Sequence, residues 1–385
     1  GSGSRRCDVQ RLRPTVGCHL MAIYYVKHSG GSDSNDGLSV ANAFATIQKA
    51  TDTCDAGSSI YILATGTHTP GAEIELDIKT GSANDPINIF GADASGTLLT
   101  GSNMATISGS SLSSGDHIFL ANTSGGSYYR LNNIRMTASP LSCVSASNAN
   151  SNGGTAWVCM NCRFDNNGYN SFEVGRAGSP GMLVTAINCE FDNNGNDGIG
   201  YITTNRGNWY LTGCRIHNNA NNGVSSRGYN RIVNCLIYGN GGKGAFMSTY
   251  SVEMWGNTIY DNGSHGIQNH RGDWYTAIHN NIIAGNGGYG LYSATTSYDE
   301  LEVHNANNLF HNNSSGTSNT GAVAVLGINN IEADPDFVST TEGNADFLRP
   351  SASSPAKGAG LNGTDIGSVT SAGGGGGGGT VGFAL

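Results

Sequence analysis

The sequence is poor in charged residues and proline, and it has no long apolar run. Charged side chains make up only 12% of the 385 residues, proline occurs 8 times, and the formal net charge is −9. A general nucleic-acid binder carries a basic surface, so this charge balance argues against one. No stretch of about 18 apolar residues is present to form a membrane span. We therefore expect neither nucleic acid nor a membrane as a partner.

The two ends of the chain differ in composition from its middle. Residues 1–20 begin with Gly-Ser-Gly-Ser, contain several Arg and lack a hydrophobic stretch. We interpret them as an expression scar, with no signal peptide visible. Residues 368–385 contain the run Gly373–Gly379 and are predicted to form a glycine-rich tail. Residues 21–367 are predicted to form one folded domain.

A short unit recurs through this middle region. Two copies read Asn-Cys-Arg-Phe-Asp-Asn-Asn-Gly from Asn161 and Asn-Cys-Glu-Phe-Asp-Asn-Asn-Gly from Asn188. Further copies, at intervals of 21 to 27 residues, begin at Gly213, Asn234, Gly256, Asn280 and Asn307. A period of this length indicates a solenoid, and the frequent Gly and Asn leave room only for short strands in each unit. We predict one coil of β-strands and turns per repeat.

Alignment of the repeats places like residues in columns. Neighbouring parallel strands lie about 4.8 Å apart, so identical side chains of successive coils stack. The seventh position predicts a buried asparagine ladder, formed by Asn167, Asn194, Asn219, Asn240, Asn262, Asn286 and Asn313. The second position predicts small apolar members of the core, namely Cys162, Cys189, Cys214 and Cys235.

The sequence Cys159-x-x-Cys162 resembles a metal or redox motif. On one strand, however, positions i and i+3 face opposite sides, and we therefore expect no metal at these thiols.

A solenoid needs protection of its end coils against edge pairing. Residues 44–54 place Phe44, Ile47, Ala50 and Cys54 on one helical face and predict a capping helix. Near the other end, Ala333–Phe337 is a closing segment rich in residues that break strands.

Several segments resemble the pectate-lyase-like superfamily of right-handed parallel β-helix proteins. Near the N-terminus these are Tyr24–Val26, Ser32–Leu38, Ala43–Ala50 and Gly57–His68. Residues that look like the C-terminal coils of the superfamily are Ala333–Phe337, Ser354–Ala356 and Thr364–Gly367. The resemblance implies an all-β fold, a right-handed parallel β-helix (solenoid) with an N-terminal capping helix. Members are mainly polysaccharide lyases, hydrolases and epimerases, together with phage tailspikes.

A row of arginines recurs at similar distances from the coil starts: Arg176, Arg206, Arg227 and Arg271. Arginine suits bidentate contact with carboxylates or sulfates. Nearby aromatic rings can offer apolar faces to sugars, and the candidates are Tyr201, Trp209, Tyr229, Tyr250 and Trp274. We name Arg176, Arg271 and these aromatics as substrate-binding candidates. The alternative is that Arg-Gly marks a repeated turn, with the aromatics packed between coils.

The segment Ser226–Asn234 resembles the chondroitinase-B and alginate-lyase family, which uses a Lys and an Arg on adjacent coils. The resemblance implies catalytic roles for Arg206 and Arg227. Arg206 occupies the position of the family's Lys, a departure that matters because arginine is a poor base.

Lys243 is a substitute candidate for the base, with a solvated turn lysine as the alternative. His265 and His270 are candidates for proton transfer near neutral pH, and a structural turn histidine is the alternative for each.

No cofactor is expected to be required, although Asp197, with Glu173, is a candidate Ca2+ site. The same two residues are the one pair to test as hydrolytic carboxylates.

We predict a polysaccharide lyase that acts on an acidic polysaccharide such as alginate or another uronate polymer. The alternative is a phage tailspike or adhesin that binds or hydrolyses a surface glycan without lyase activity. Either function predicts an extracellular or virion-associated protein, as a monomer or a homotrimer.

Overall fold

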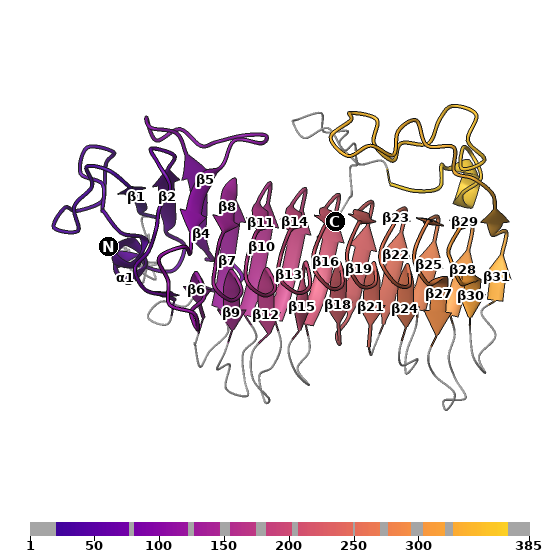
Figure 1. Ribbon diagram of the computed structural model, residues 1–385. Coiled ribbons are helices and arrows are strands. Elements are labelled where there is room, and N and C mark those ends of the chain that lie inside the picture. Colours follow the sequence, from indigo (N-terminus) through magenta and orange to yellow (C-terminus); the bar gives the residue numbers. More distant parts are fainter. Residues whose placement is uncertain are drawn as a thin grey trace, which may run out of the picture.

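The computed structural model describes ten segments, 21–76, 81–121, 127–146, 155–174, 182–201, 207–248, 251–269, 276–293, 303–319 and 326–368. They form an elongated stack of coils in which strands of successive coils pair side by side (Figure 1). All pairings between the named strands are parallel. This arrangement follows from the repeat, since a repeating coil supplies one strand to each side of the solenoid.

The largest sheet, called sheet A here, has 12 strands. They are β1 (Ile23–Lys27), β2 (Ser59–Leu63), β4 (Ile87–Ala92), β7 (Ser127–Asn132), β10 (Thr155–Met160), β13 (Met182–Ile187), β16 (Gly207–Thr212), β19 (Asn230–Val233), β22 (Val252–Trp255), β25 (Thr276–His279), β28 (Val303–Ala306) and β31 (Leu326–Ile328).

The second sheet, sheet B, has 10 strands. They are β5 (Ala105–Ser108), β8 (Ile134–Thr137), β11 (Arg163–Asp165), β14 (Glu190–Asp192), β17 (Arg215–His217), β20 (Leu236–Tyr238), β23 (Thr258–Tyr260), β26 (Ile282–Ala284), β29 (Leu309–His311) and β32 (Ile331–Glu332).

The third side of the solenoid consists of two sheets of five strands each. Sheet C contains β3 (Ile74–Glu75), β6 (Phe119–Leu120), β9 (Val144–Ala146), β12 (Phe172–Val174) and β15 (Gly200–Tyr201). Sheet D contains β18 (Val224–Ser226), β21 (Ala245–Met247), β24 (Ile267–Asn269), β27 (Tyr289–Ser293) and β30 (Gly316–Asn319). A bridge between Ile199 and Val224 joins the two.

The asparagine ladder is confirmed. The side-chain amide of Asn194 donates to Oδ1 of Asn219 at 2.9 Å, and Asn219 donates to Asn240 at 2.9 Å. The same oxygens also accept the backbone N–H of the asparagine in the preceding coil. Because these amides are buried, an amide without its hydrogen-bond partners would destabilise the fold. The ladder satisfies the hydrogen-bonding groups of the side chains and of the turn backbone together.

The predicted cysteine column lies in the core, but the assumption that Cys159 and Cys162 share one strand and face opposite sides was wrong. Both thiols are buried instead of facing opposite sides. The strand rule does not apply because β10 ends at Met160, and Asn161 turns the chain with a positive φ of 51°. Burial raises the pKa of Cys159 well above its ordinary value, which keeps the thiol neutral.

The predicted helix is present as α1 (Ile47–Thr53), a shorter element than residues 44–54. Thr46 caps it by accepting the backbone N–H of Lys49. Phe44, Ile47, Ala50 and Cys54 are buried as predicted. Its function as an end cap stays a prediction. In the described part of the chain, no helix is long and apolar enough to cross a membrane.

The segment 333–368 does not add coils to the stack, contrary to the resemblance. It turns back over the outer face of sheet B, above β23 and β29 in Figure 1. Phe347 and Leu348 pack with Leu236 and Tyr238 of β20. Further along, Ala356 and Ile366 pack with three apolar residues of β26 and β29. Part of sheet B is therefore covered, whereas outward residues of sheet A such as Tyr210 and Trp255 are exposed.

Candidate functional site

A groove of about 600 Å³ lies on the outer face of sheet A. It crosses four adjacent strands, β13, β16, β19 and β22, and therefore runs along the axis of the solenoid. Its lining consists of Thr185, Ile187, Tyr210, Thr212, Tyr229, Asn230, Arg231, Val233, Ser251 and Glu253.

Alternation along the strands decides which aromatic rings reach this groove. Successive residues of β16 point inward and outward in turn. Tyr210 therefore faces outward and is 41% exposed, while Trp209 is fully buried. The indole N–H of Trp209 donates to the backbone oxygen of Ser225 at 2.8 Å. The prediction that Trp209 binds substrate was wrong because its ring belongs to the core.

Tyr229 lines the groove and is 42% exposed, as a sugar-binding ring must be. It precedes β19, and its backbone N–H donates to Oδ1 of Asn208 in the neighbouring coil at 2.8 Å. Arg227 lies two residues earlier in the same connection and is partly buried. The structure thus places Arg227 and Tyr229 near one another, at the border between sheets D and A.

The charged residues of the groove lie on adjacent strands. Arg231 and Glu253 are paired in register, and their side chains approach to 3.5 Å. Both side chains are about half exposed, so their attraction contributes little to stability. The sequence prediction missed both residues and Tyr210. The alternation of β16, β19 and β22 would have found them, because these residues occupy outward positions.

Lys243 and His265 lie at the N-terminal ends of strands of sheet D, whereas Arg227 lies at the C-terminal end of one. Lys243 precedes β21, whereas the position paired with Arg227 follows that strand. The extended segment from Lys243 to the position paired with Arg227 is about 15 Å long. The backbone positions therefore separate Arg227 from Lys243 and His265, and a catalytic site shared by the three stays a prediction.

The local contacts of Lys243 and His265 explain their positions. The ammonium of Lys243 lies 4.9 Å from the ring centre of Phe246, and burial lowers its pKa. Nδ1 of His265 accepts the backbone N–H of Tyr289, and its ring stacks on Tyr292. Burial, followed by the charge of Lys243, lowers the pKa of His265. A histidine that accepts at Nδ1 is held neutral with its proton on Nε2.

The predicted calcium ligands are used in other contacts. Oδ1 of Asp197 accepts three hydrogen bonds of 2.9 Å from Asn221 and Asn222, and Oδ2 accepts the hydroxyl of Ser225. Glu173 accepts the hydroxyl of Ser142 at 3.0 Å. Burial raises the pKa of Glu173 and of Asp197. Both oxygens of Asp197 thus accept hydrogen bonds within the protein, and the calcium site stays a prediction.

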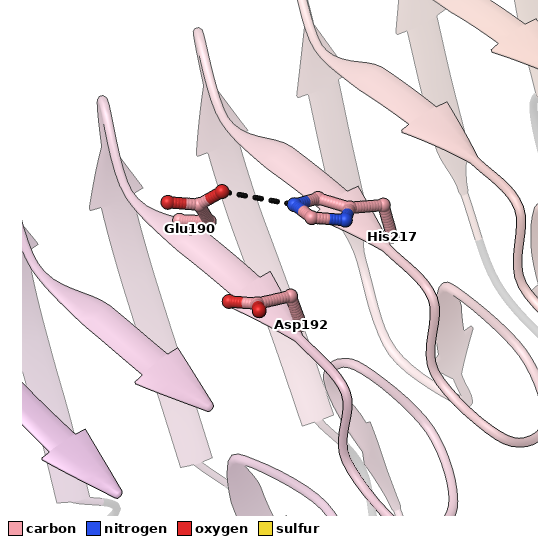
Figure 2. A group of neighbouring side chains, drawn as sticks. All are labelled: Glu190, Asp192 and His217. Carbon is pink, nitrogen blue, oxygen red and sulfur yellow. Dashed lines mark hydrogen bonds and ion pairs between the residues drawn. The ribbon is translucent and has the colours of Figure 1, made fainter. Parts of the chain in front are cut away.

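Another group of potential metal ligands consists of Glu190, Asp192 and His217 on sheet B (Figure 2). Figure 2 shows Glu190 and Asp192 on one strand and His217 on the next. Nε2 of His217 lies 2.9 Å from Oε1 of Glu190. Asp192 accepts two hydrogen bonds from Arg163, at 2.9 and 2.8 Å. Arg215 lies 3.2 Å from Glu190. Two guanidinium groups therefore already neutralise these carboxylates, and the group does not fit a metal ion.

The electrostatics of Glu190 agree with this interpretation. Burial alone raises its pKa, but the hydrogen bond with His217 and the charges of Arg215 and Arg163 outweigh burial and lower the pKa to about 2. The carboxylate is thus held ionised by its neighbours, as in a structural ion-pair network.

The remaining predicted site residues cannot be placed. Outside the described residues lie Arg176, Arg206, Tyr250, His270, Arg271 and Trp274. The backbone of Tyr201 belongs to β15, but its side chain is also outside the described part. Their suggested roles stay predictions.

Comparison with known proteins identifies the fold. A family model described as a right handed beta helix region matches residues 177–334. The structure of pectate lyase Pel9A is similar with a TM-score of 0.61 and 19% identity, over 90% of this chain and 95% of that chain. A comparison with curated proteins finds no match.

Other solved structures are similar at a lower level. A rhamnogalacturonan lyase gives a TM-score of 0.42 with 14% identity, over 86% of this chain and 97% of that chain. The A-module of the Azotobacter vinelandii mannuronan C-5 epimerase AlgE4 gives 0.37 with 14% identity, over 72% of this chain and 91% of that chain.

The protein is therefore a right-handed parallel β-helix, a solenoid made almost entirely of parallel sheets. Within that class it has the pectate-lyase-like fold, as the sequence predicted.

Proposed function

We propose that the groove on sheet A binds an acidic polysaccharide and that the protein cleaves this polymer by β-elimination. The single observation that carries the proposal is the open groove itself, in which two exposed tyrosines flank Arg231. Tyrosine faces suit sugar rings, and a guanidinium suits the carboxylate of a uronic acid. The groove crosses strands about 4.8 Å apart, so an extended polymer along it meets a new coil at each step.

The chemistry of β-elimination needs two kinds of group. A cation neutralises the uronate carboxylate, and an acid–base pair removes the C5 proton and assists the C4 oxygen. We assign the first role to Arg231, assisted by Arg227 from the border of sheets D and A. The lining side chains that can transfer a proton are Tyr210, Tyr229 and Glu253. Arg206 and His270, predicted from sequence for the same chemistry, remain candidates.

A second candidate function is glycan binding without cleavage, as in a phage adhesin. It is favoured by the lining of the groove, which contains neither Lys nor His among the described residues. Both candidates require an extracellular or virion-associated protein.

A polymer assay separates these functions. The protein is incubated with alginate, polygalacturonate, chondroitin and hyaluronan, and ultraviolet absorbance of unsaturated sugar ends is followed. A rise in absorbance supports the lyase, and release of reducing ends without it indicates hydrolysis. Retention of a polymer without either product supports the adhesin.

The Tyr210→Ala variant tests the groove. We expect it to weaken polymer binding about tenfold, since it removes one stacking ring. Tyr128→Ala is the matched control, because Tyr128 lies on β7 of the same sheet outside the groove. Equal effects of the two substitutions, or none from either, would reject the groove as the binding site.

A further inference from the structure

One row of outward residues on sheet A has an uneven distribution of charge. Its members are Cα partners on successive strands. From β7 to β25, in order along the solenoid, they are Arg130, Val158, Thr185, Tyr210, Arg231, Glu253 and Ala277. The four residues that precede Ala277 in this row lie on β13, β16, β19 and β22, the strands that line the groove.

The cations of this row are far apart. Arg130 and Arg231 are separated by three uncharged residues, which corresponds to about 19 Å at the usual spacing of strands. The next residue of the row, Glu253, carries the opposite charge, and its Oε2 lies 3.5 Å from Nε of Arg231. A polymer lying on the row thus meets one cation, several neutral steps, a second cation and then an anion.

The rest of the groove does not compensate for Glu253. The parallel row of lining residues consists of Ile187, Thr212 and Val233, all uncharged. Arg231 and Glu253 are the charged residues of the described lining. The lining residues are therefore neutral in sum, although Arg231 gives the groove one local cationic position and Arg227 lies at its border.

This pattern distinguishes between classes of acidic polymer. A uronate homopolymer has a carboxylate on every sugar, so binding at Arg231 also brings carboxylates close to Glu253. Like charges at such short range repel. A neutral sugar in that position instead offers hydroxyl groups, which donate hydrogen bonds to a carboxylate.

We propose that the groove selects an acidic heteropolysaccharide in which neutral sugars separate the anionic ones, in preference to a uronate homopolymer. The proposal rests on the function assigned to the groove above, and it narrows the substrate class expected from the sequence. In it, Arg231 holds the anionic sugar, and Glu253 is a specificity-determining residue that accepts hydroxyl groups of a neutral neighbour and repels a second carboxylate.

The test is binding of the full chain to three polymers by affinity electrophoresis. Polygalacturonate carries a carboxylate on every sugar, deacylated gellan carries one glucuronate in each repeating unit among neutral sugars, and dextran is neutral. We expect gellan to bind more tightly than polygalacturonate. Glu253→Gln should raise the affinity for polygalacturonate about tenfold, with a smaller change for gellan. Glu75→Gln is the control, because it removes an exposed carboxylate from β3 of sheet C.

Arg231→Gln provides an independent readout: it should abolish the preference for gellan over dextran. The inference is overturned, and the groove function retained, if the native protein binds polygalacturonate as tightly as gellan and Glu253→Gln leaves that ratio unchanged. If none of the three polymers binds, both the selectivity inference and the proposed function of the groove are overturned. Thermal unfolding of each variant confirms that the exposed substitutions leave the fold intact.

Discussion

The outer faces of sheets A and B are built from the same coils, yet they differ in what they leave open. On sheet B, arginines pair with acidic residues of neighbouring strands and form a network. On sheet A, the corresponding positions over the groove are mostly uncharged, and the aromatic rings remain exposed. The comparison teaches that vertical stacking by itself does not determine whether a face is structural or available to a ligand. On sheet B, the ion-pair network and the covering segment 333–368 together close the face.

The network on sheet B is compact. Asp165 and Asp192 are fully buried although they lie at outward positions, because each carboxylate is covered by an arginine of the preceding coil. At its far end, Tyr238 stacks on His217 and its hydroxyl donates to Glu342 at 2.8 Å. Glu342 belongs to the segment that covers sheet B, so the network also fastens this segment to the solenoid.

Loss of a buried carboxylate should have the largest effect. We expect Asp192→Ala to destabilise the protein by about 3 to 5 kcal/mol, because Arg163 loses its partner within the network. Glu253→Ala breaks the exposed pair on sheet A and should cost about 1 kcal/mol or less. The denaturant midpoints of the two variants, compared with that of the native protein, measure both losses of stability. Equal costs would show that the two faces do not differ in the way described.

Acid should act on sheet B through Glu190. Its pKa is lowered to about 2 in the folded protein, from an ordinary value of 4.5. A carboxylate with a depressed folded pKa stabilises the fold above its unfolded pKa and loses that contribution as pH falls. The contribution, about 3 kcal/mol, should therefore disappear between about pH 4.5 and pH 2.

Glu190→Gln isolates this contribution. The stability difference between native protein and variant should be largest at neutral pH and should vanish toward pH 2, as measured by thermal unfolding across that range. A difference that is independent of pH would contradict the assignment.

Substitution of one tyrosine on each sheet compares the two faces directly. Tyr238→Ala on sheet B should lower stability by about 3 kcal/mol, since it removes a buried ring. Tyr210→Ala on sheet A should change stability by about 0.5 kcal/mol or less, because the ring is exposed. Unfolding and polymer binding, measured on both variants, should give opposite rankings of the two residues.

The smallest expected effect concerns the covering segment. Glu342→Gln weakens the contacts of the segment with Tyr238 and His217, and the loss should be about 1 kcal/mol. Hydrogen exchange in residues 333–368 should become faster, while the strands of sheet A keep their protection. Unchanged exchange would show that the apolar contacts of Phe347 and Leu348 hold the segment alone.

Much of the fold could be predicted from the sequence. The repeat predicted the coils, the asparagine ladder and the cysteine column, because these depend on residues that recur at one position in each coil. The site was harder to predict. Trp209 and Tyr210 are adjacent, and attention to the aromatic motif alone selected the buried ring instead of the exposed one. Lys243, His265 and Arg227 lie on neighbouring coils, but Arg227 lies at the other end of the sheet D strands from Lys243 and His265.

The sequence by itself determined that like residues would stack, since a strand spacing near 4.8 Å leaves a repeated residue beside its own copy. Only the tertiary structure decided which outward face stays open. That depends on how the segment 333–368 returns over sheet B, and on contacts such as Tyr238 with Glu342 between residues far apart in the chain. Such contacts form through packing and charge complementarity, and a local repeat carries no information about them.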